Sequence, residues 1–127
     1  IPHVRLAGAD VAAGGVSFRL QCAACHSWAG EGGALVSRAA PPTNHATPTQ
    51  IFEAIRIGPG AMPRFGQAAL TDAEVNNVVA YARYLNHPVD RGGDPLGRIG
   101  PLAEGAAALF VGLGLLALAS RWIGTRG

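Results

Sequence analysis

The sequence of 127 residues contains two cysteines, one methionine and no lysine, and all ten basic residues are arginine. Charged residues make up 14% of the chain and the formal net charge is +2, so the strongly basic surface of a nucleic-acid-binding protein is not expected. Two cysteines cannot form a second C-x-x-C pair, which excludes a Cys₄ zinc site. No internal repeat is visible.

Both cysteines belong to the motif Cys22-Ala23-Ala24-Cys25-His26. C-x-x-C-H is the spacing at which two thiols bond a haem covalently while the adjacent imidazole ligates its iron. A redox dithiol, part of a metal site and a local disulfide are the alternatives. The dithiol would need a βαβ pattern, which is not visible, and the disulfide would close only a very small loop. We therefore predict one covalent haem c, with His26 as its proximal ligand.

The second axial position of the iron could be left open or filled by Met62, His3, His45 or His87. Met62 lies in a loop rich in glycine and proline, whereas a methionine that only fills the core is expected on a helical stripe. We predict Met62, and we expect the other three histidines at the surface or near a mobile end. Ligation by histidine and methionine leaves no open position for oxygen or peroxide, so it favours electron transfer over bond-making catalysis.

The first predicted helix runs from residue 10 to residue 22, into the cysteine motif. Asp10 can cap its start, and Val11 and Phe18 share one apolar side with the first cysteine. Gly14 lies on this side too, where a residue without a side chain lets another helix cross closely. Phe18 is then expected against the haem edge.

Two further helices begin with capping boxes. Thr47-Pro48-Thr49-Gln50 starts a helix that runs from Pro48 to about Ile57, where Gly58-Pro59-Gly60 stops it. Thr71-Asp72-Ala73-Glu74 starts a helix that is predicted to run to Asn86. Its apolar stripe consists of Val75, Val78, Val79, Ala82 and Leu85.

A long apolar segment lies near the C-terminus. As a helix rising ~1.5 Å per residue, residues 101 to 123 would cover roughly 30 Å, about the thickness of a hydrocarbon core. A buried amphipathic helix would show recurring polar residues, and none occurs between Gly105 and Ala119. A C-terminal position excludes a signal peptide. The sequence therefore predicts one transmembrane helix, residues 101 to 124.

Residues flanking this helix predict its orientation. Arg121 and Arg126 place positive charge at its C-terminal end, and Trp122 suits the membrane interface. The C-terminus is then cytoplasmic and the haem domain extracytoplasmic, the side on which bacteria attach haem covalently. The predicted organisation is a haem domain over residues 1–87, a linker over 88–100, the transmembrane helix and a cytoplasmic tail over 125–127.

Residues 8 to 87 resemble class I cytochrome c, an all-α fold with covalently bound haem. The resemblance rests on the spacing of Gly14, Phe18, Cys22, Cys25 and His26, on the Met62-Pro63 loop and on Val78-Val79-Ala80-Tyr81.

This resemblance has two structural implications. The first and last helices should cross, with Gly14 and Phe18 against Val78 and Tyr81. A proline carbonyl should accept a hydrogen bond from the proximal histidine, and Pro41 is the candidate, with Pro42 next to it. The predicted cofactor-binding residues are therefore Cys22, Cys25, His26, Met62, Phe18 and Pro41, and the candidate propionate donors are Arg38, Trp28 and Arg64.

A narrower resemblance rests on CHSWAGEGGAL, APPTNHATPTQIFEAIRIGPGAMPRF and LGRIGP before a C-terminal anchor. These segments are similar to the cytochrome c subunit of actinobacterial quinol:cytochrome c reductases, the bcc complexes that join a cytochrome aa₃ oxidase. The resemblance implies a membrane-embedded electron carrier that is reduced by a Rieske iron–sulfur protein, associates with cytochrome b and passes electrons toward the oxidase. Members of that family carry two haem domains. This sequence has one C-x-x-C-H and opens at Ile1 without a methionine, so we expect that an N-terminal haem domain is missing from it.

Other functions stay open at this point. The same features would suit a cytochrome subunit of a terminal oxidase or of a periplasmic dehydrogenase. A haem enzyme or a gas sensor would require an open iron position. The absence of lysine removes the ring of charges that small mobile cytochromes often use for docking, which favours a permanently held partner.

Overall fold

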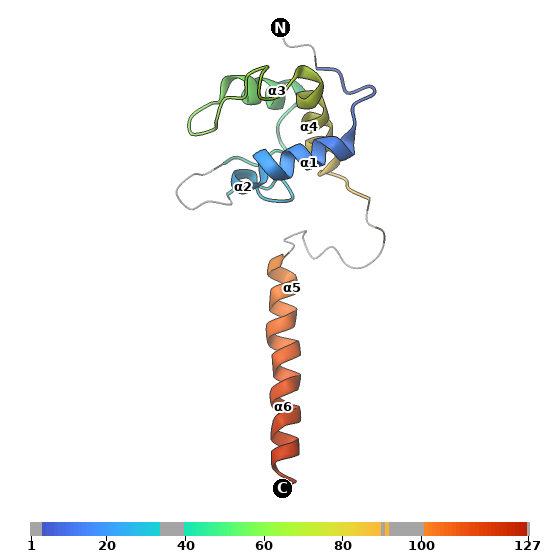
Figure 1. Cartoon of the computed structure of the whole chain (residues 1–127), viewed down its shortest axis with the longest axis vertical. Coiled ribbons are helices and arrows are strands. Elements are labelled where there is room, and N and C mark those ends of the chain that lie inside the picture. Colours follow the sequence, from blue (N-terminus) through green and yellow to red (C-terminus); the bar gives the residue numbers. More distant parts are fainter. Residues whose placement is uncertain (1–3, 34–39, 90, 92–100, 127) are drawn as a thin grey trace. The chain divides into compact units, whose positions relative to one another are not determined.

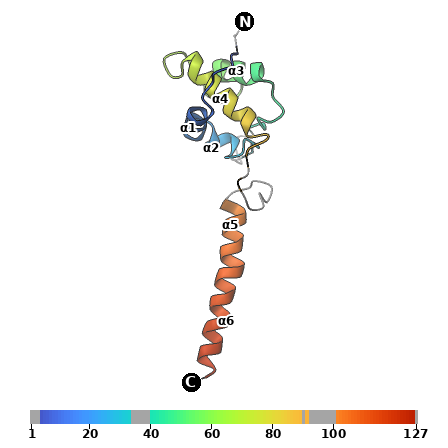
Figure 2. The ribbon, with the colours of Figure 1, turned by 90° about the vertical axis from the view of Figure 1, so that its right-hand side faces the viewer.

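The computed structural model describes residues 4–33, 40–89, 91 and 101–126. The chain divides into two compact units, Ile1–Val89 and Asp90–Gly127. The regular elements of the described residues are all helical (Figures 1 and 2), as the all-α prediction requires. In the first unit they are α1 (Val11–Gln21), α2 (Ala23–His26), α3 (Pro48–Ile57) and α4 (Asp72–Tyr84).

The predicted caps start three of these helices. The side chain of Asp10 accepts a hydrogen bond from the backbone N–H of Ala13 at the start of α1. At the start of α3, Thr47 and Gln50 form a reciprocal capping box. Thr71 and Glu74 form a second box at the start of α4. These bonds satisfy N–H groups that have no partner within the first turn, so the helix starts are set locally.

The crossing of α1 over α4 organises the first unit. A Cβ atom at Gly14 would lie 1.9 Å from the carbonyl oxygen of Asn77 and 3.0 Å from the nitrogen of Val78, so only glycine allows this approach. The ring centres of Phe18 and Tyr81 lie 5.4 Å apart, and the two rings are tilted relative to one another. The predicted crossing of the first and last helices of this unit is confirmed.

The core lies between these helices and α3. Phe18 is buried, and so are four residues of the predicted stripe on α4, while Leu85 packs against the core from its edge. α3 contributes Ile51, Phe52 and Ile55. Burying such side chains supplies the main stabilisation of a small domain.

The burial of Val11 and the end of the last helix of this unit differ from the sequence prediction. Val11 is 37% exposed, because it lies one turn before the crossing point at Gly14 and crossing helices diverge from that point. α4 ends at Tyr84 rather than Asn86, in turn-type hydrogen bonds just before Pro88. The first helix runs into the motif as predicted: it ends at Gln21 with Cys22 as its C-cap, and α2 follows as a separate turn.

The second unit consists of α5 (Pro101–Ala107), a π-helical segment η2 (Ala108–Gly112) and α6 (Leu113–Gly124). Leu102–Gly124 is long and apolar enough to cross a membrane, and most of its side chains are exposed. Beyond its last turn, the guanidinium of Arg126 lies 4.3 Å from the ring centre of Trp122. The predicted linker falls outside the described residues except for positions 88, 89 and 91.

Candidate haem site

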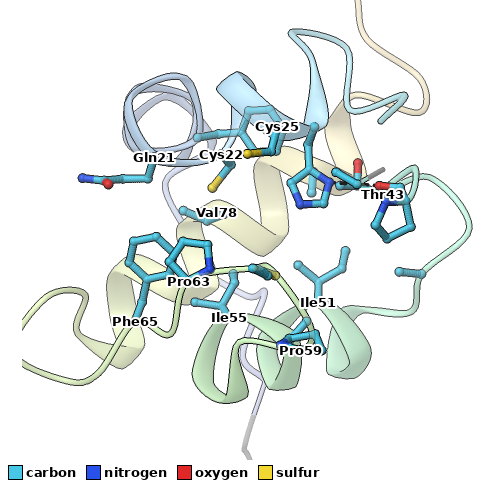
Figure 3. A pocket seen from close by; sticks show the side chains of 18 of the residues that line it. Gln21, Cys22, Cys25, Thr43, Ile51, Ile55, Pro59, Pro63, Phe65 and Val78 are labelled. Atoms are coloured by element: carbon cyan, nitrogen blue, oxygen red, sulfur yellow. Dashed lines mark hydrogen bonds between the residues drawn. The ribbon is translucent and has the colours of Figure 1, made fainter. Parts of the chain in front are cut away.

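A cavity of about 240 Å³ opens within the first unit. Figure 3 shows Cys22 and Cys25 on one side of it, facing Ile51, Ile55 and Pro59 on the other. Among the described residues that line it, none is acidic or an arginine. The lining includes all six predicted cofactor-binding residues, namely Phe18, Cys22, Cys25, His26, Pro41 and Met62.

A single helical turn presents the motif to the cavity. The backbone N–H groups of Cys25 and His26 both donate to the carbonyl oxygen of Cys22, at 3.1 and 2.9 Å. Residues at i, i+3 and i+4 of a helical turn share one face, so both thiols and the imidazole point the same way. Burial, and to a lesser degree the neighbouring Cys25, raises the pKa of the Cys22 thiol to about 11.

The imidazole of His26 is oriented by a backbone carbonyl. Its Nδ1 lies 2.9 Å from the carbonyl oxygen of Pro41, as the resemblance implies. A carbonyl can only accept, so Nδ1 carries the proton and Nε2 keeps a lone pair for a metal. Such a bond fixes both the tautomer and the ring direction of a histidine ligand.

Two backbone segments hold the Pro41 carbonyl in place. Gly33 donates to the carbonyl of Ala40 at 3.0 Å, and Thr43 donates to the carbonyl of Gly30 through both its backbone (2.7 Å) and its hydroxyl (3.1 Å). Between these bonds, a Cβ atom at Gly32 would lie 2.3 Å from the carbonyl oxygen of Ala40. The segments therefore pack backbone to backbone, which only glycine permits here.

Met62 reaches the cavity from a tight loop after α3. Gly58 ends that helix in the left-handed conformation, with φ of 68°. A Cβ atom at Gly58 would lie 2.9 Å from the carbonyl oxygen of Met62, so the loop folds directly onto this glycine. Met62 is half-buried, and its N–H donates to the carbonyl of Pro59 at 3.1 Å.

The remaining histidines do not reach the cavity in the part of the chain that the structure describes. His45 and His87 are exposed and do not line it. His3 lies outside the described residues, as does Arg38. Trp28 and Arg64, the other candidate propionate donors, are exposed and do not line the cavity.

The donor set and walls of the cavity fit a haem c. Two thiols on one wall, a free imidazole nitrogen, a thioether and apolar side chains are what covalent attachment and axial ligation require. No group of three or more His, Cys, Asp or Glu side chains that could hold a metal ion occurs among residues 4–33, 40–89, 91 and 101–126.

Comparisons with known proteins agree with this geometry. The family described as "Cytochrome C oxidase, cbb3-type, subunit III" matches residues 9–81, more than half of the chain. The chain belongs to this cytochrome c family. It is 40% identical over 119 residues to the "Cytochrome bc1 complex cytochrome c subunit" of Corynebacterium diphtheriae, which covers 93% of this chain and 42% of the relative.

Similar proteins come from other actinobacteria. The relatives of the same name from Mycobacterium leprae and Mycobacterium tuberculosis are each 38% identical over 122 residues, covering 95% of this chain. They are covered over 42% and 44% of their own length. This cytochrome c chain therefore spans less than half the length of the curated relatives it matches.

Some residues of the cytochrome c site were not predicted from the sequence. Ile51, Ile55 and Phe65 line the cavity, and none was predicted to do so. The spacing of the two isoleucines on one face of α3 was a usable signal. The close packing of Gly32 against Ala40 had no such signal, because a glycine in the sequence does not show which backbone segment lies against it.

Proposed function

We propose that this chain binds one haem c covalently and carries single electrons. The observation that supports this best is the convergence of the C-x-x-C-H turn, a histidine held at its Nδ1 and a methionine loop on one apolar cavity. A haem bound there would supply a one-electron ferric/ferrous couple.

Each site residue has a role in this proposal. Cys22 and Cys25 would form the two thioether bonds, and His26 would ligate the iron through Nε2 while Pro41 holds its Nδ1 proton. Met62 would be the second ligand, and Phe18 would pack against the haem edge. Ligation by histidine and methionine raises the reduction potential and closes the iron to exogenous ligands.

We further propose that the chain is the membrane-anchored cytochrome c subunit of a quinol:cytochrome c reductase. Support comes from the relatives named as cytochrome bc1 complex subunits and from the apolar helix Leu102–Gly124. Its partners would be the cytochrome b and Rieske subunits and membrane lipid, with a cytochrome aa₃ oxidase as the electron acceptor.

The proposed organisation follows from the apolar helix. Residues 1–87 form the haem domain and 88–100 the linker to a membrane helix at 101–124. The positive charges of Arg121 and Arg126 favour a cytoplasmic tail at 125–127 and an extracytoplasmic haem domain in the plasma membrane.

A second candidate function is a cytochrome subunit of a terminal oxidase. The description of the matching family, subunit III of a cbb3-type oxidase, favours it. The same cavity would serve both functions, because each needs only a one-electron carrier.

Purification of this chain from its native membranes in mild detergent separates these functions. We expect haem staining on a denaturing gel, together with a Rieske protein, b-type haem and a-type haem in the purified material. Recovery with oxidase subunits but without a Rieske protein would favour the terminal oxidase. A chain without covalently bound haem would contradict the whole proposal.

A further inference from the structure

The side chain of Arg56 on α3 reaches three acceptors around the segment that precedes α4. Its Nη1 donates to the carbonyl oxygens of Phe65 at 2.9 Å and Leu70 at 2.7 Å, and its Nη2 donates to Oδ1 of Asp72 at 2.6 Å. The side chain is 18% exposed, and its guanidinium lies 5.4 Å from the centre of the Phe52 ring. Hydrogen bonds from a charged donor in such surroundings are among the stronger ones in proteins.

These bonds close the loop that contains Met62. The N–H of Phe65 donates to the carbonyl of Ile55 at 2.9 Å, while its carbonyl accepts from Arg56. Ile55 and Arg56 are neighbours on α3, so the loop leaves this helix at Gly58 and returns to the turn it has just left. Both polar groups of the Phe65 backbone are then held by α3.

The side chain of Met62 depends on this closure. A thioether is only a weak hydrogen-bond acceptor and cannot be oriented by strong polar contacts, unlike the imidazole of His26. The position of the Met62 sulfur is therefore set by the backbone of its loop. Arg56 holds the end of that loop three residues after Met62.

We propose that Arg56 is a positioning residue that keeps Met62 directed into the cavity. This inference rests on the proposed function, in which Met62 ligates the haem iron. Without the guanidinium, the Phe65 and Leu70 carbonyls lose a shared donor and the closed loop becomes one of several accessible conformations. The iron would then be open to exogenous ligands for part of the time.

The test uses the full haem-bearing chain in detergent with Arg56→Gln, Arg56→Lys and, as the matched control, Arg83→Gln. Arg83 is an exposed residue near the end of α4, so its replacement removes the same charge away from the loop. Imidazole binding to the ferric protein reports how readily Met62 leaves the iron. The long-wavelength sulfur-to-iron absorption band reports ligation directly.

We expect Arg56→Gln to bind imidazole about tenfold more tightly than the unmodified chain and to lose part of the sulfur-to-iron band. Arg56→Lys should fall between them, because an ammonium keeps the charge but not the fork of donors. Arg83→Gln should match the unmodified chain. Should Arg56→Gln not accumulate, the Arg56→Lys titration decides alone.

Unchanged imidazole affinity and an unchanged band in the Arg56 variants would overturn the proposal, even if their thermal stability falls. That result would leave Arg56 with a structural role only. An unmodified chain that lacks the sulfur-to-iron band would instead overturn the assignment of Met62 and with it this inference. The two failures are therefore distinguishable.

Discussion

The two sides of the cavity present their ligand candidates in different ways. His26 follows directly on two potential covalent attachment points, and its ring makes a hydrogen bond of its own to Pro41. Met62 lies in a loop, and backbone bonds at Pro59 and Phe65 fix its course. The imidazole is thus fixed by a hydrogen bond of its own ring, whereas the thioether depends on how the loop of Met62 folds onto α3.

This difference suggests unequal tolerance to change. A ligand oriented through its own ring loses its place only when its immediate neighbours move. A ligand oriented through its backbone is sensitive to every residue that closes the loop. The methionine side is therefore where the structure can adjust access to the iron.

Replacing the two ligands separately tests the comparison most severely. We expect His26→Ala to yield little haem-bearing protein, because the proximal ligand adjoins the attachment sites. Met62→Ala should retain covalent haem and, once reduced, should bind carbon monoxide, because its iron gains an open position. Haem-stained gels and carbon monoxide difference spectra measure both. A Met62→Ala chain that does not bind carbon monoxide would show that another residue is the second ligand.

On the histidine side, Gly32 and Gly33 form a matched pair. Both have positive φ, 77° and 67°, but an added Cβ would meet the carbonyl oxygen of Ala40 at 2.3 Å only at Gly32. We expect Gly33→Ala to cost about 1–2 kcal/mol of unfolding free energy from backbone strain, and Gly32→Ala about 1–3 kcal/mol more. Denaturant unfolding of the haem-bearing chain measures both.

The reduction potential separates stability from ligand orientation in this pair. Gly32→Ala should also change the potential, because the displaced segment carries the Pro41 carbonyl that orients His26. Equal effects of the two substitutions would show that this backbone contact contributes nothing.

On the methionine side, Gly58 and Gly60 offer the corresponding pair. Their φ values are 68° and 60°, but an added Cβ would meet the backbone of Arg64 at 2.8 Å only at Gly58. We expect Gly60→Ala to cost about 1–2 kcal/mol, and Gly58→Ala about 1 kcal/mol more, because this contact is less severe. Gly58→Ala alone should strengthen imidazole binding. The same affinity in both variants would contradict the proposed role of the close contact.

The smallest predicted effect is the loss of unfolding free energy at low pH. Side-chain hydrogen bonds lower the pKa of Asp72 below 3.8, and the bond from Arg56 contributes more than the bond from Gln67. Hydrogen bonds from Thr71 lower the pKa of Glu74 below 4.5. A lowered pKa in the folded state means that the stabilisation is complete above these values and is lost as the pH falls through the folded pKa.

Unfolding free energy should therefore decline below about pH 4.5, and Asp72→Asn and Glu74→Gln should each flatten this decline. Denaturant titrations between pH 3 and pH 7 measure it, each variant against the unmodified chain. An acid response that neither substitution alters would assign the decline to other groups.

The features that the sequence predicted well are local or rest on spacing. The caps at Asp10, Thr47 and Thr71 involve residues three positions apart, so a short stretch of sequence is enough to predict them. The crossing at Gly14 was predicted because the resemblance supplied the partner helix. His26 was predicted from the C-x-x-C-H spacing and Met62 from its loop of glycine and proline, whereas Pro41 came from the resemblance.

The features that the sequence did not predict depend on backbone atoms far along the chain. Arg56 donates to two backbone carbonyls. Every residue carries such a carbonyl, so residue type does not show which one will accept. The pairing of Gly32 with Ala40 has the same origin. The exposure of Val11 is set by where α1 diverges from α4, which helical periodicity does not encode.

The apolar helix Leu102–Gly124 bears on how the proposed carrier would meet its redox partners. Freely diffusing carriers raise their encounter rates with complementary surface charge, and ionic strength weakens that attraction. A carrier tethered to a membrane helix would instead rely on effective concentration, which the tether length sets and dissolved salt leaves unchanged. Electron transfer from a carrier held in this way would then proceed at nearly the same rate in dilute and in saline surroundings.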